Sequence, residues 1–197
     1  MATNFPPFRS LGRPFSARLW ELVGGTGLER FQLVRQPETW ILQGTIIRLH
    51  ERRPIEARYS VVCDLHWRTL NCDVALRDHD GERSVVAENQ NGFWIVNGKQ
   101  HPEIKGCIDI DLEWSPSTNS LPIRRLNLAE GAESELVNAA WIRFPELTLQ
   151  RLPQTYFRLG SRRYRYSSGD HTFNAELLVD EHGIVEDYKG YWEHRSE

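Results

Sequence analysis

Apolar and polar residues alternate along most of this chain, and the alternation limits the folds available to it. In residues 58–67, apolar side chains stand at every second position: Tyr59, Val61, Cys63, Leu65 and Trp67. The same period of two recurs near residues 72–76, 108–114 and 173–179. This period is typical of β-strands with one buried and one solvated face, and helical spacing never persists beyond about two turns. The sequence therefore predicts a mainly β protein.

Glycine-containing turn signals separate the predicted strands. They include Asp80-Gly81, Asn97-Gly98, Ser168-Gly169 and His182-Gly183. Glycine supplies the positive φ that tight hairpin turns require. We therefore expect one curled antiparallel β-roll or open barrel of about ten to fifteen strands over residues 15–197, with little helix. Residues 1–14, which hold three prolines, are expected to form a loose N-terminal arm.

The composition narrows the class of protein. The chain has 197 residues, 40% of them hydrophobic, and a net charge of -3, values typical of a soluble globular protein rather than a disordered or membrane-spanning one. Its three cysteines lack the C-x-x-C spacing of redox and metal sites. The first 14 residues contain no apolar run of signal-peptide length. These features predict a reduced, cytoplasmic protein.

Three carboxylates occupy one face of the predicted strand at residues 107–114. Asp109, Asp111 and Glu113 alternate there with isoleucine, leucine and tryptophan. Alternate strand residues lie about 6.6 Å apart, which falls within the carboxyl separation of inverting glycosidases and could also seat a divalent cation. A solvated acidic face matched by Arg124 and Arg125 explains the same residues. Both interpretations stay open at the level of sequence.

A polar segment with two prolines, residues 115–122, interrupts the strand pattern. Prolines cannot continue a β-ladder, so a specific structure is expected here. Residues 121–126 could form a short helix with Pro122 in its first turn, or an extended edge. A structural role is a further possibility, in which Asn119 and Arg124 tie this segment to the carboxylate strand through charge-assisted hydrogen bonds.

Tyrosines and arginines alternate near the C-terminus. Tyr164 and Tyr166 fall on one strand face and Arg163 and Arg165 on the other, downstream of Tyr156. Rings and arginines together are typical of nucleic-acid surfaces, but here they face opposite ways and the chain is acidic overall. No nucleic-acid partner is therefore expected. The pattern fits an interior lined by tyrosines with arginines outside, or the reverse.

Metal and cofactor motifs are weak throughout the sequence. The seven histidines show no spacing that converges on zinc, and no phosphate loop, dinucleotide motif or nucleophile elbow occurs. The run Asp78-His79-Asp80-Gly81 is similar to the opening of a calcium loop but lacks the later ligands, so it predicts a hairpin turn. No metal and no cofactor are expected.

Seven tryptophans are more than a small core needs. They could fill a wide interior, or they could line a hydrophobic cavity with polar groups for an amphipathic ligand. Trp67 and Trp114 lie on two of the predicted strands. Larger numbers of strands leave more interior room, which favours a cavity.

Two motifs resemble a known family. Residues 106–111 read G-C-x-D-x-D, and residues 116–126 read P-x-T-N-x-L-P-I-R-R-L. This long pattern resembles the putative glycolipid-binding family of bacterial proteins, and the resemblance extends from Trp20 to Trp192. It implies a curled, mostly antiparallel β-roll, similar to bacterial lipoprotein carriers, and a glycolipid ligand. It implies no catalytic residues.

We therefore expect a non-catalytic carrier or sensor that holds a glycolipid or similar amphipathic ligand, with the acyl chain among the tryptophans. The alternative is an enzyme that acts on a sugar or polar metabolite through Asp109 and Asp111. No integral membrane association is expected, and the oligomeric state is left open. The candidate ligand-binding residues are Asp109, Asp111, Asn119, Arg124, Arg125, Tyr156, Tyr164, Tyr166, Trp67 and Trp114.

Overall fold

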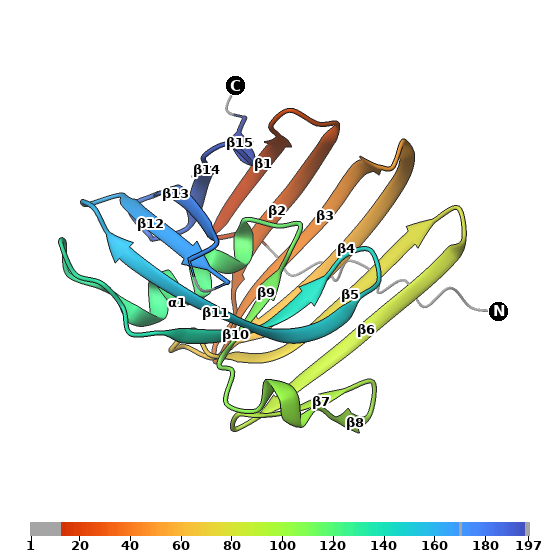
Figure 1. Cartoon of the computed structure of the whole chain (residues 1–197), viewed down its shortest axis with the longest axis horizontal. Helices are drawn as coiled ribbons and strands as arrows, with labels where there is room; N and C mark the ends of the chain where they lie inside the picture. Colours follow the sequence, from red (N-terminus) through yellow and green to blue (C-terminus); the bar gives the residue numbers. More distant parts are fainter. Residues whose placement is uncertain (1–12, 170, 196–197) are drawn as a thin grey trace.

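The architecture is one curled sheet, seen in a computed structural model that describes residues 13–169 and 171–195 (Figure 1). Within these residues it has fifteen strands in the order β8-β7-β6-β5-β4-β3-β2-β1-β15-β14-β13-β12-β11-β10-β9. Neighbouring strands run antiparallel, except that β9 and β10 are parallel. The sheet is not closed into a barrel, so the predicted mainly β, open roll is confirmed. Residues 1–12 of the predicted N-terminal arm lie outside the described residues.

The strands of the first half are β1 (Ser16–Leu22), β2 (Gly27–Arg35), β3 (Trp40–His50), β4 (Arg53–Cys63), β5 (Thr69–Asp78), β6 (Gly81–Gln90), β7 (Phe93–Val96) and β8 (Lys99–Gln100). Those of the second half are β9 (Asp109–Leu112), β10 (Val137–Arg143), β11 (Thr148–Arg158), β12 (Arg163–Ser168), β13 (Phe173–Val179), β14 (Val185–Tyr188) and β15 (Trp192–His194). The helical segments are the 3₁₀ turns η1 (Pro102–Ile104) and η2 (Ser117–Asn119) and the α-helix α1 (Ser120–Leu126).

Strand β4 shows how far the alternation extends. Its inward residues, from Ile55 to Cys63, are buried at every second position. The strand then ends, because the Asp64 carboxylate accepts hydrogen bonds from the backbone N–H of His66 at 2.8 Å and of Arg68 at 2.9 Å. This local turn replaces the ladder. The expected continuation of the strand to Trp67 is therefore wrong.

The proline segment lies inside the curl of the sheet (Figure 1). Every residue from Ser115 to Ile123 is buried. Of the two structures considered for residues 121–126, the helix is confirmed, with Pro122 in the first turn of α1. Proline is tolerated there because the first backbone N–H groups of a helix have no intrahelical acceptor. Asn127 ends the helix in the left-handed conformation, with φ of 43°.

Small polar side chains allow this segment to be buried. The hydroxyl of Thr118 accepts a hydrogen bond from the backbone N–H of Leu112 at 3.1 Å. The hydroxyl of Ser120 accepts one from the backbone N–H of Val185 at 3.0 Å. Buried backbone groups require such partners. The serines and threonine of the motif therefore fasten the segment to β9 on one side and to β14 on the other.

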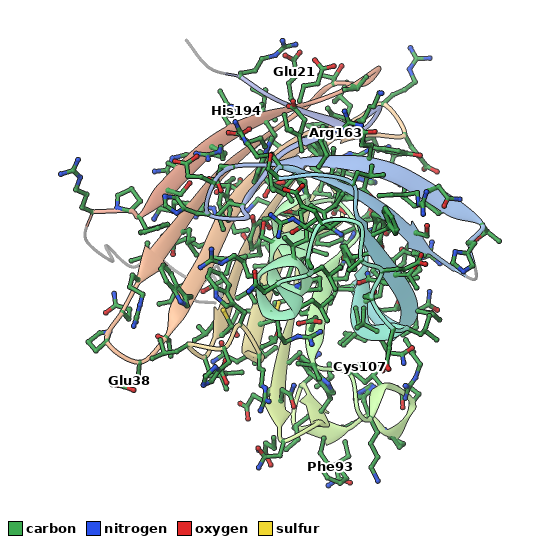
Figure 2. The ribbon with its side chains drawn as sticks, turned by 90° about the vertical axis from the view of Figure 1, so that its left-hand side faces the viewer. Glu21, Glu38, Phe93, Cys107, Arg163 and His194 are labelled. Atoms are coloured by element: carbon green, nitrogen blue, oxygen red, sulfur yellow. The ribbon has the colours of Figure 1, made fainter. Side chains whose placement is uncertain are left out.

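Strand β9 also crosses back towards the first half of the sheet. The hydroxyl of Thr69 accepts a hydrogen bond from the backbone N–H of Ile110 at 3.1 Å, and the Trp94 indole donates to the Cys107 carbonyl at 2.9 Å. Side chains fill the space within the curl, and Cys107 lies towards the end that carries Phe93 (Figure 2). These contacts hold the curl without forming a continuous ladder.

Candidate amphipathic ligand cavity

A cavity of about 510 Å³ lies between β9 and the strands β10 to β15. Small-molecule sites typically have volumes of about 300–1,000 Å³. Its carboxyl and amide groups come from the β9–η2 segment, and its rings come from β10 and from β12 to β15 and their turns, where Ser168 and Thr172 add hydroxyl groups. The lining residues are Asp111, Leu112, Glu113, Ser115, Asn119, Trp141, Leu152, Tyr166, Ser168, Gly169, Thr172, Phe173, Tyr188, Tyr191 and Trp192.

A chain of hydrogen bonds supports the polar wall of this cavity. Gln154 Nε2 donates to Asp111 Oδ2 at 2.6 Å and lies 3.0 Å from the Tyr166 hydroxyl. The Tyr156 hydroxyl donates to Gln154 Oε1 at 3.2 Å and accepts from Asn119 Nδ2 at 3.0 Å. All five side chains are buried. The network fixes Asp111 because each buried polar group in it has a partner.

Asp111 is a carboxyl group that titrates near neutral pH. Burial raises its pKa to about 7, while the hydrogen bond from Gln154 opposes this change. The nearby carboxylates Glu113 and Asp109 raise the pKa further. Asp111 can therefore be neutral or charged under ordinary conditions, which is typical of groups in functional cavities.

Asp109, two residues earlier on β9, is closed against α1. Arg125 donates to both of its carboxylate oxygens, at 3.1 and 2.5 Å, and Asp109 is only 2% exposed. Burial raises the pKa of Asp109, and the Arg125 guanidinium lowers it. The expected solvated acidic face is thus wrong, since Asp109 and Asp111 are both buried. The structural tie does exist, but Arg125 forms it instead of Arg124.

Arg124 and Tyr164 lie at a different cavity, of about 360 Å³, beside the β13–β14 turn. Arg124 donates to the His182 carbonyl, and its guanidinium stacks over the Trp67 ring at 4.7 Å from the centroid. Arg124 therefore anchors α1 to this turn. Arg124 and Tyr164, both candidate ligand-binding residues, thus lie apart from Asp111 and do not line the larger cavity.

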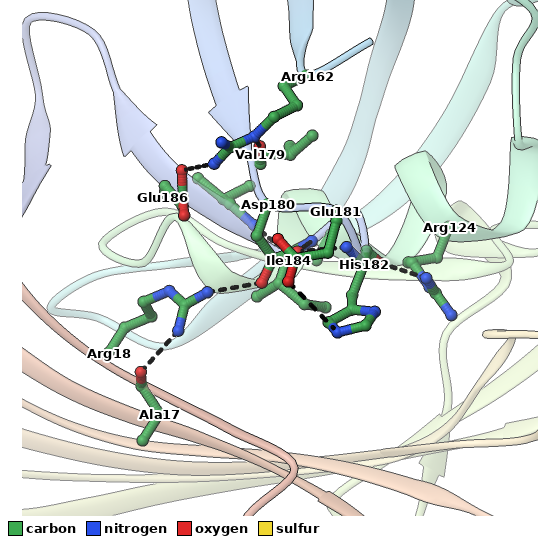
Figure 3. A network of polar contacts seen from close by, with 12 residues as sticks. Ala17, Arg18, Arg124, Arg162, Val179, Asp180, Glu181, His182, Ile184 and Glu186 are labelled. Carbon is green, nitrogen blue, oxygen red and sulfur yellow. Dashed lines mark hydrogen bonds and ion pairs between the residues drawn. The ribbon is translucent and has the colours of Figure 1, made fainter.

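Asp180 holds that turn in place (Figure 3). Its carboxylate accepts hydrogen bonds from Arg18 at 2.6 Å and from the backbone N–H of His182 and Ile184 at 2.9 Å each. Arg18 belongs to β1, so the network joins the first half of the sheet to the β13–β14 turn. These charges have structural partners, which leaves the larger cavity as the better candidate site.

The predicted tryptophans Trp67 and Trp114 do not line the larger cavity. Trp67 stacks on Trp40 with ring centroids 4.9 Å apart, and Trp114 stacks on Phe144 at 5.0 Å. Most of the tryptophans fill the core, and two of them line the cavity, where an acyl chain could contact them. Those two are Trp141 and Trp192.

A further buried carboxyl group, absent from the sequence predictions, lies behind the polar wall. Glu29 is fully buried, and its Oε1 accepts hydrogen bonds from the Tyr59 hydroxyl at 2.5 Å and from Ser115 Oγ at 2.7 Å. Burial raises the pKa of Glu29 to about 8. The signal was present in the sequence, because Glu29 takes an inward strand position two residues before Phe31. Gln154 was also missed as a site residue.

The Asp78-His79-Asp80 run forms the β5–β6 hairpin turn, as predicted. Among the described residues, this run is where three potential metal ligands come together, and their ligand atoms lie within 4.8 Å of one another. Its Asp78 carboxylate is already bound by Arg83 at 2.8 Å and by the backbone N–H of Asp80 at 2.9 Å. These contacts are those of a hairpin turn, and they favour no metal site.

The fold and site define an open β-roll with an amphipathic cavity, and comparisons identify its family. The family described as "Putative glycolipid-binding" matches residues 17–194, and the chain belongs to this family. The chain is also similar to the crystal structure of a DUF1089 family protein from Pseudomonas aeruginosa. That similarity has 31% identity and a TM-score of 0.76 and covers 85% of this chain and 91% of the other. No curated protein sequence matches. In the described part of the chain, the helices are too short to cross a membrane.

Proposed function

We propose that this protein binds an amphipathic ligand, a glycolipid or a molecule of similar build, in the 510 Å³ cavity, and that it acts as a non-catalytic carrier or sensor. The observation that carries the proposal is that this one cavity combines carboxyl and amide groups of the β9–η2 segment with a cluster of aromatic rings from β12 to β15. The family to which the chain belongs supports the same class of ligand.

The apolar part of the ligand is placed against rings from β13, β14 and the turn that follows. Phe173 and Tyr191 have ring centroids 5.2 Å apart, and Tyr188 and Tyr191 have centroids 5.3 Å apart. Such rings give a large apolar surface of fixed shape, and the tyrosine hydroxyls add polar groups at its edge. A short acyl chain or the face of a sugar ring matches this wall.

The polar part of the ligand is placed at the β9–η2 segment. Asp111, Ser115 and Asn119 all lie on this segment and line the cavity. A few fixed polar groups in a mostly apolar pocket set the orientation of a ligand. The ligand head would therefore lie at Asp111 with its apolar part directed towards β13 and β14.

An enzyme that uses Asp109 and Asp111 together is favoured less than binding. Such a reaction needs both carboxyl groups at the same ligand, as in the paired acids of glycosidases. Arg125 occupies both oxygens of Asp109, which does not line the cavity. One carboxyl group of the pair is thus already committed to the fold.

We also propose a cytoplasmic location. The three cysteines, Cys63, Cys72 and Cys107, are unpaired and buried, and unpaired cysteines are typical of proteins in reducing compartments. Fractionation of the native cells checks the location: recovery in the soluble cytoplasmic fraction supports it, and recovery outside the cytoplasm contradicts it.

Ligand binding is tested on freshly purified protein by native mass spectrometry, followed by solvent extraction, and by titration with the neutral amphiphilic dye Nile red. We expect a co-purified amphiphile or saturable dye binding. Leu152→Trp, which places a larger side chain in the cavity wall and narrows the space for a ligand, should weaken dye binding at least tenfold. The matched control Leu136→Trp alters a side chain that is 60% exposed and outside the lining, and it should leave binding unchanged. A protein that carries no amphiphile and does not bind the dye contradicts the proposal.

A further inference from the structure

The charges around the larger cavity have one sign. Its described lining residues include the carboxyl groups of Asp111 and Glu113 but no lysine, arginine or histidine. Arg125 is neutralised by Asp109 at 2.5 Å. Arg143 is the ion-pair partner of Glu113 at 3.5 Å and is itself outside the lining. Glu113 also accepts a hydrogen bond from the backbone N–H of Phe144 at 2.7 Å, so Asp111 is the acid left for a ligand. An anionic head such as a carboxylate, sulfate or phosphate would therefore meet this acid and no cation of the described lining.

One oxygen of Asp111 is left for a ligand. Gln154 occupies Oδ2, and within residues 13–169 and 171–195 no group donates a hydrogen bond to Oδ1. A carboxylate can accept several hydrogen bonds, so one donor leaves it unsaturated. Asp111 is 9% exposed and lines the cavity, which is where another donor can reach it.

Four aromatic rings in the lining of this cavity have the chemistry of a cation site. Tyr166, Phe173, Tyr188 and Tyr191 come from adjacent elements, and their rings contact one another with centroids 5.2 to 6.3 Å apart. The face of an aromatic ring is electron-rich and attracts ammonium groups, most strongly where water is excluded. Several rings beside a carboxylate are the arrangement that recognises alkylated amines.

We propose that the ligand of this cavity carries a positively charged nitrogen, a protonated amine or a quaternary ammonium. This nitrogen sits between Asp111 and the Tyr166 end of the ring cluster, while the apolar part of the ligand lies further along the cluster, against Phe173 and Tyr191. The inference rests on the proposed function and specifies the head group of the ligand. In a glycolipid, the corresponding group is a free amino sugar. Neutral sugars without an amine and anionic lipids are the ligands it disfavours.

The titration of Asp111 supports this assignment. A bound cation stabilises the charged carboxylate, so it lowers the pKa of Asp111 from about 7 and binds best when that proton is gone. The groups that face Asp111 are Asp109 and Glu113 on its own strand, and Tyr156, Tyr166 and Tyr188 from the packed strands. Burial raises the pKa of all three tyrosines, so they stay neutral. Among these groups, Asp111 is therefore the one whose charge changes near neutral pH.

Three amphiphiles with the same tail test the proposal on the wild-type protein: octyltrimethylammonium, octyl glucoside and octyl sulfate, each below its critical micelle concentration. Calorimetry and intrinsic tryptophan fluorescence, to which Trp141 and Trp192 of the lining contribute, give the affinities at a pH above the pKa of Asp111. We expect octyltrimethylammonium to bind at least tenfold tighter than octyl glucoside, and octyl sulfate to show no binding. Equal or tighter binding of the glucoside or the sulfate overturns the proposal.

Asp111→Asn then locates the preference. The amide keeps the size of the side chain and an acceptor for Gln154 but removes the charge, so the ratio of the ammonium affinity to the glucoside affinity should fall towards one. An advantage that survives in a folded Asp111→Asn protein places the cation elsewhere and overturns the proposal. Binding of the glucoside without any ammonium preference would sink only this inference. Failure of all three probes would sink the proposed function as well.

Discussion

Two buried acids on β9, two residues apart, have opposite relationships to their surroundings. Asp109 is enclosed by Arg125, which satisfies both of its oxygens and ties α1 to the strand. Asp111 has a single donor, Gln154, and faces the cavity. We call the Asp109–Arg125 junction the closed region, because its charges are paired within the protein. We call the cavity wall at Asp111 the open region, because a ligand can reach it.

The difference shows how one sequence motif serves two purposes. The strand alternation sends Asp109 and Asp111 to the same side, but α1 covers only the first of them. A charge that is paired in the interior is costly to disturb, whereas a charge beside a cavity can respond to a ligand. The following predictions separate stability effects at the closed region from binding effects at the open one.

The largest effect is expected when the Asp109–Arg125 junction loses its cation. Arg125→Met leaves Asp109 buried without a partner, and the free energy of unfolding should fall by about 3–5 kcal/mol. Denaturant unfolding at neutral pH measures the loss. Arg143→Met is the matched control, because that arginine pairs with Glu113 at the surface and should cost less than about 1 kcal/mol.

The double variant Asp109→Asn/Arg125→Met sharpens the test. Removal of both charges eliminates the unpaired carboxylate, so part of the lost stability should return. If Arg125→Met is as stable as Arg143→Met, the junction does not hold α1 in the way the geometry indicates.

Glu29, like Asp109, is enclosed by the protein. Its buried carboxyl group should make the stability of the fold depend on pH. Its pKa is raised from 4.5 to about 8, so the unfolded chain releases this proton at lower pH than the folded one. Stability from this group is present below the unfolded pKa and is lost as the pH rises towards the folded value, at up to about 1.4 kcal/mol per pH unit. Unfolding measured from about pH 5 to about pH 8 should show a decline that is shallower in Glu29→Gln. Equal slopes in the two proteins would contradict this role.

The sequence locates strands β4, β5, β9 and β13 best, because a period of two runs through all four. Such a period is expected where a strand has one inward and one outward face. The prediction failed at residues 64–67, because Asp64 forms a local turn that the apolar pattern of Leu65 and Trp67 conceals. Turn chemistry there overrides alternation.

The candidate site could be predicted only in part, because it depends on contacts between distant segments. Asp111, Asn119 and Tyr166 were named from the motif and do line the cavity. Arg124 and Tyr164 line the other cavity. That division depends on how α1 packs inside the curled sheet, and the sequence pattern of a single strand or helix does not determine this packing. Glu29 and Gln154 were missed since their partners are distant in sequence.

A smaller loss of stability is expected when Gly44, which lies behind the polar wall of the cavity, is replaced by alanine. A Cβ atom at this position would lie 2.5 to 2.6 Å from the ring and hydroxyl of Tyr59, its cross-strand neighbour. Gly44→Ala should therefore displace the donor to Glu29 and cost about 1–3 kcal/mol in unfolding free energy. Gly160→Ala is the control, because a Cβ atom there would meet no described atom within 4 Å, and it should be neutral. Equal stability of the two variants would show that Tyr59 can move freely.

The smallest change in stability is expected at Asp111, where the effect on binding is greatest. The pKa of Asp111 rises from 3.8 in its ordinary state to about 7 in the fold, so its ionisation opposes folding as the pH rises through this range. Because the carboxyl group faces the cavity, water moderates the cost, and Asp111→Asn should gain only about 1 kcal/mol at pH above 7 and nothing near pH 4. Unfolding measured at both pH values checks this. A loss of several kcal/mol at either pH would instead make Asp111 a structural group like Asp109, and the distinction between the closed and open ends of β9 would not hold.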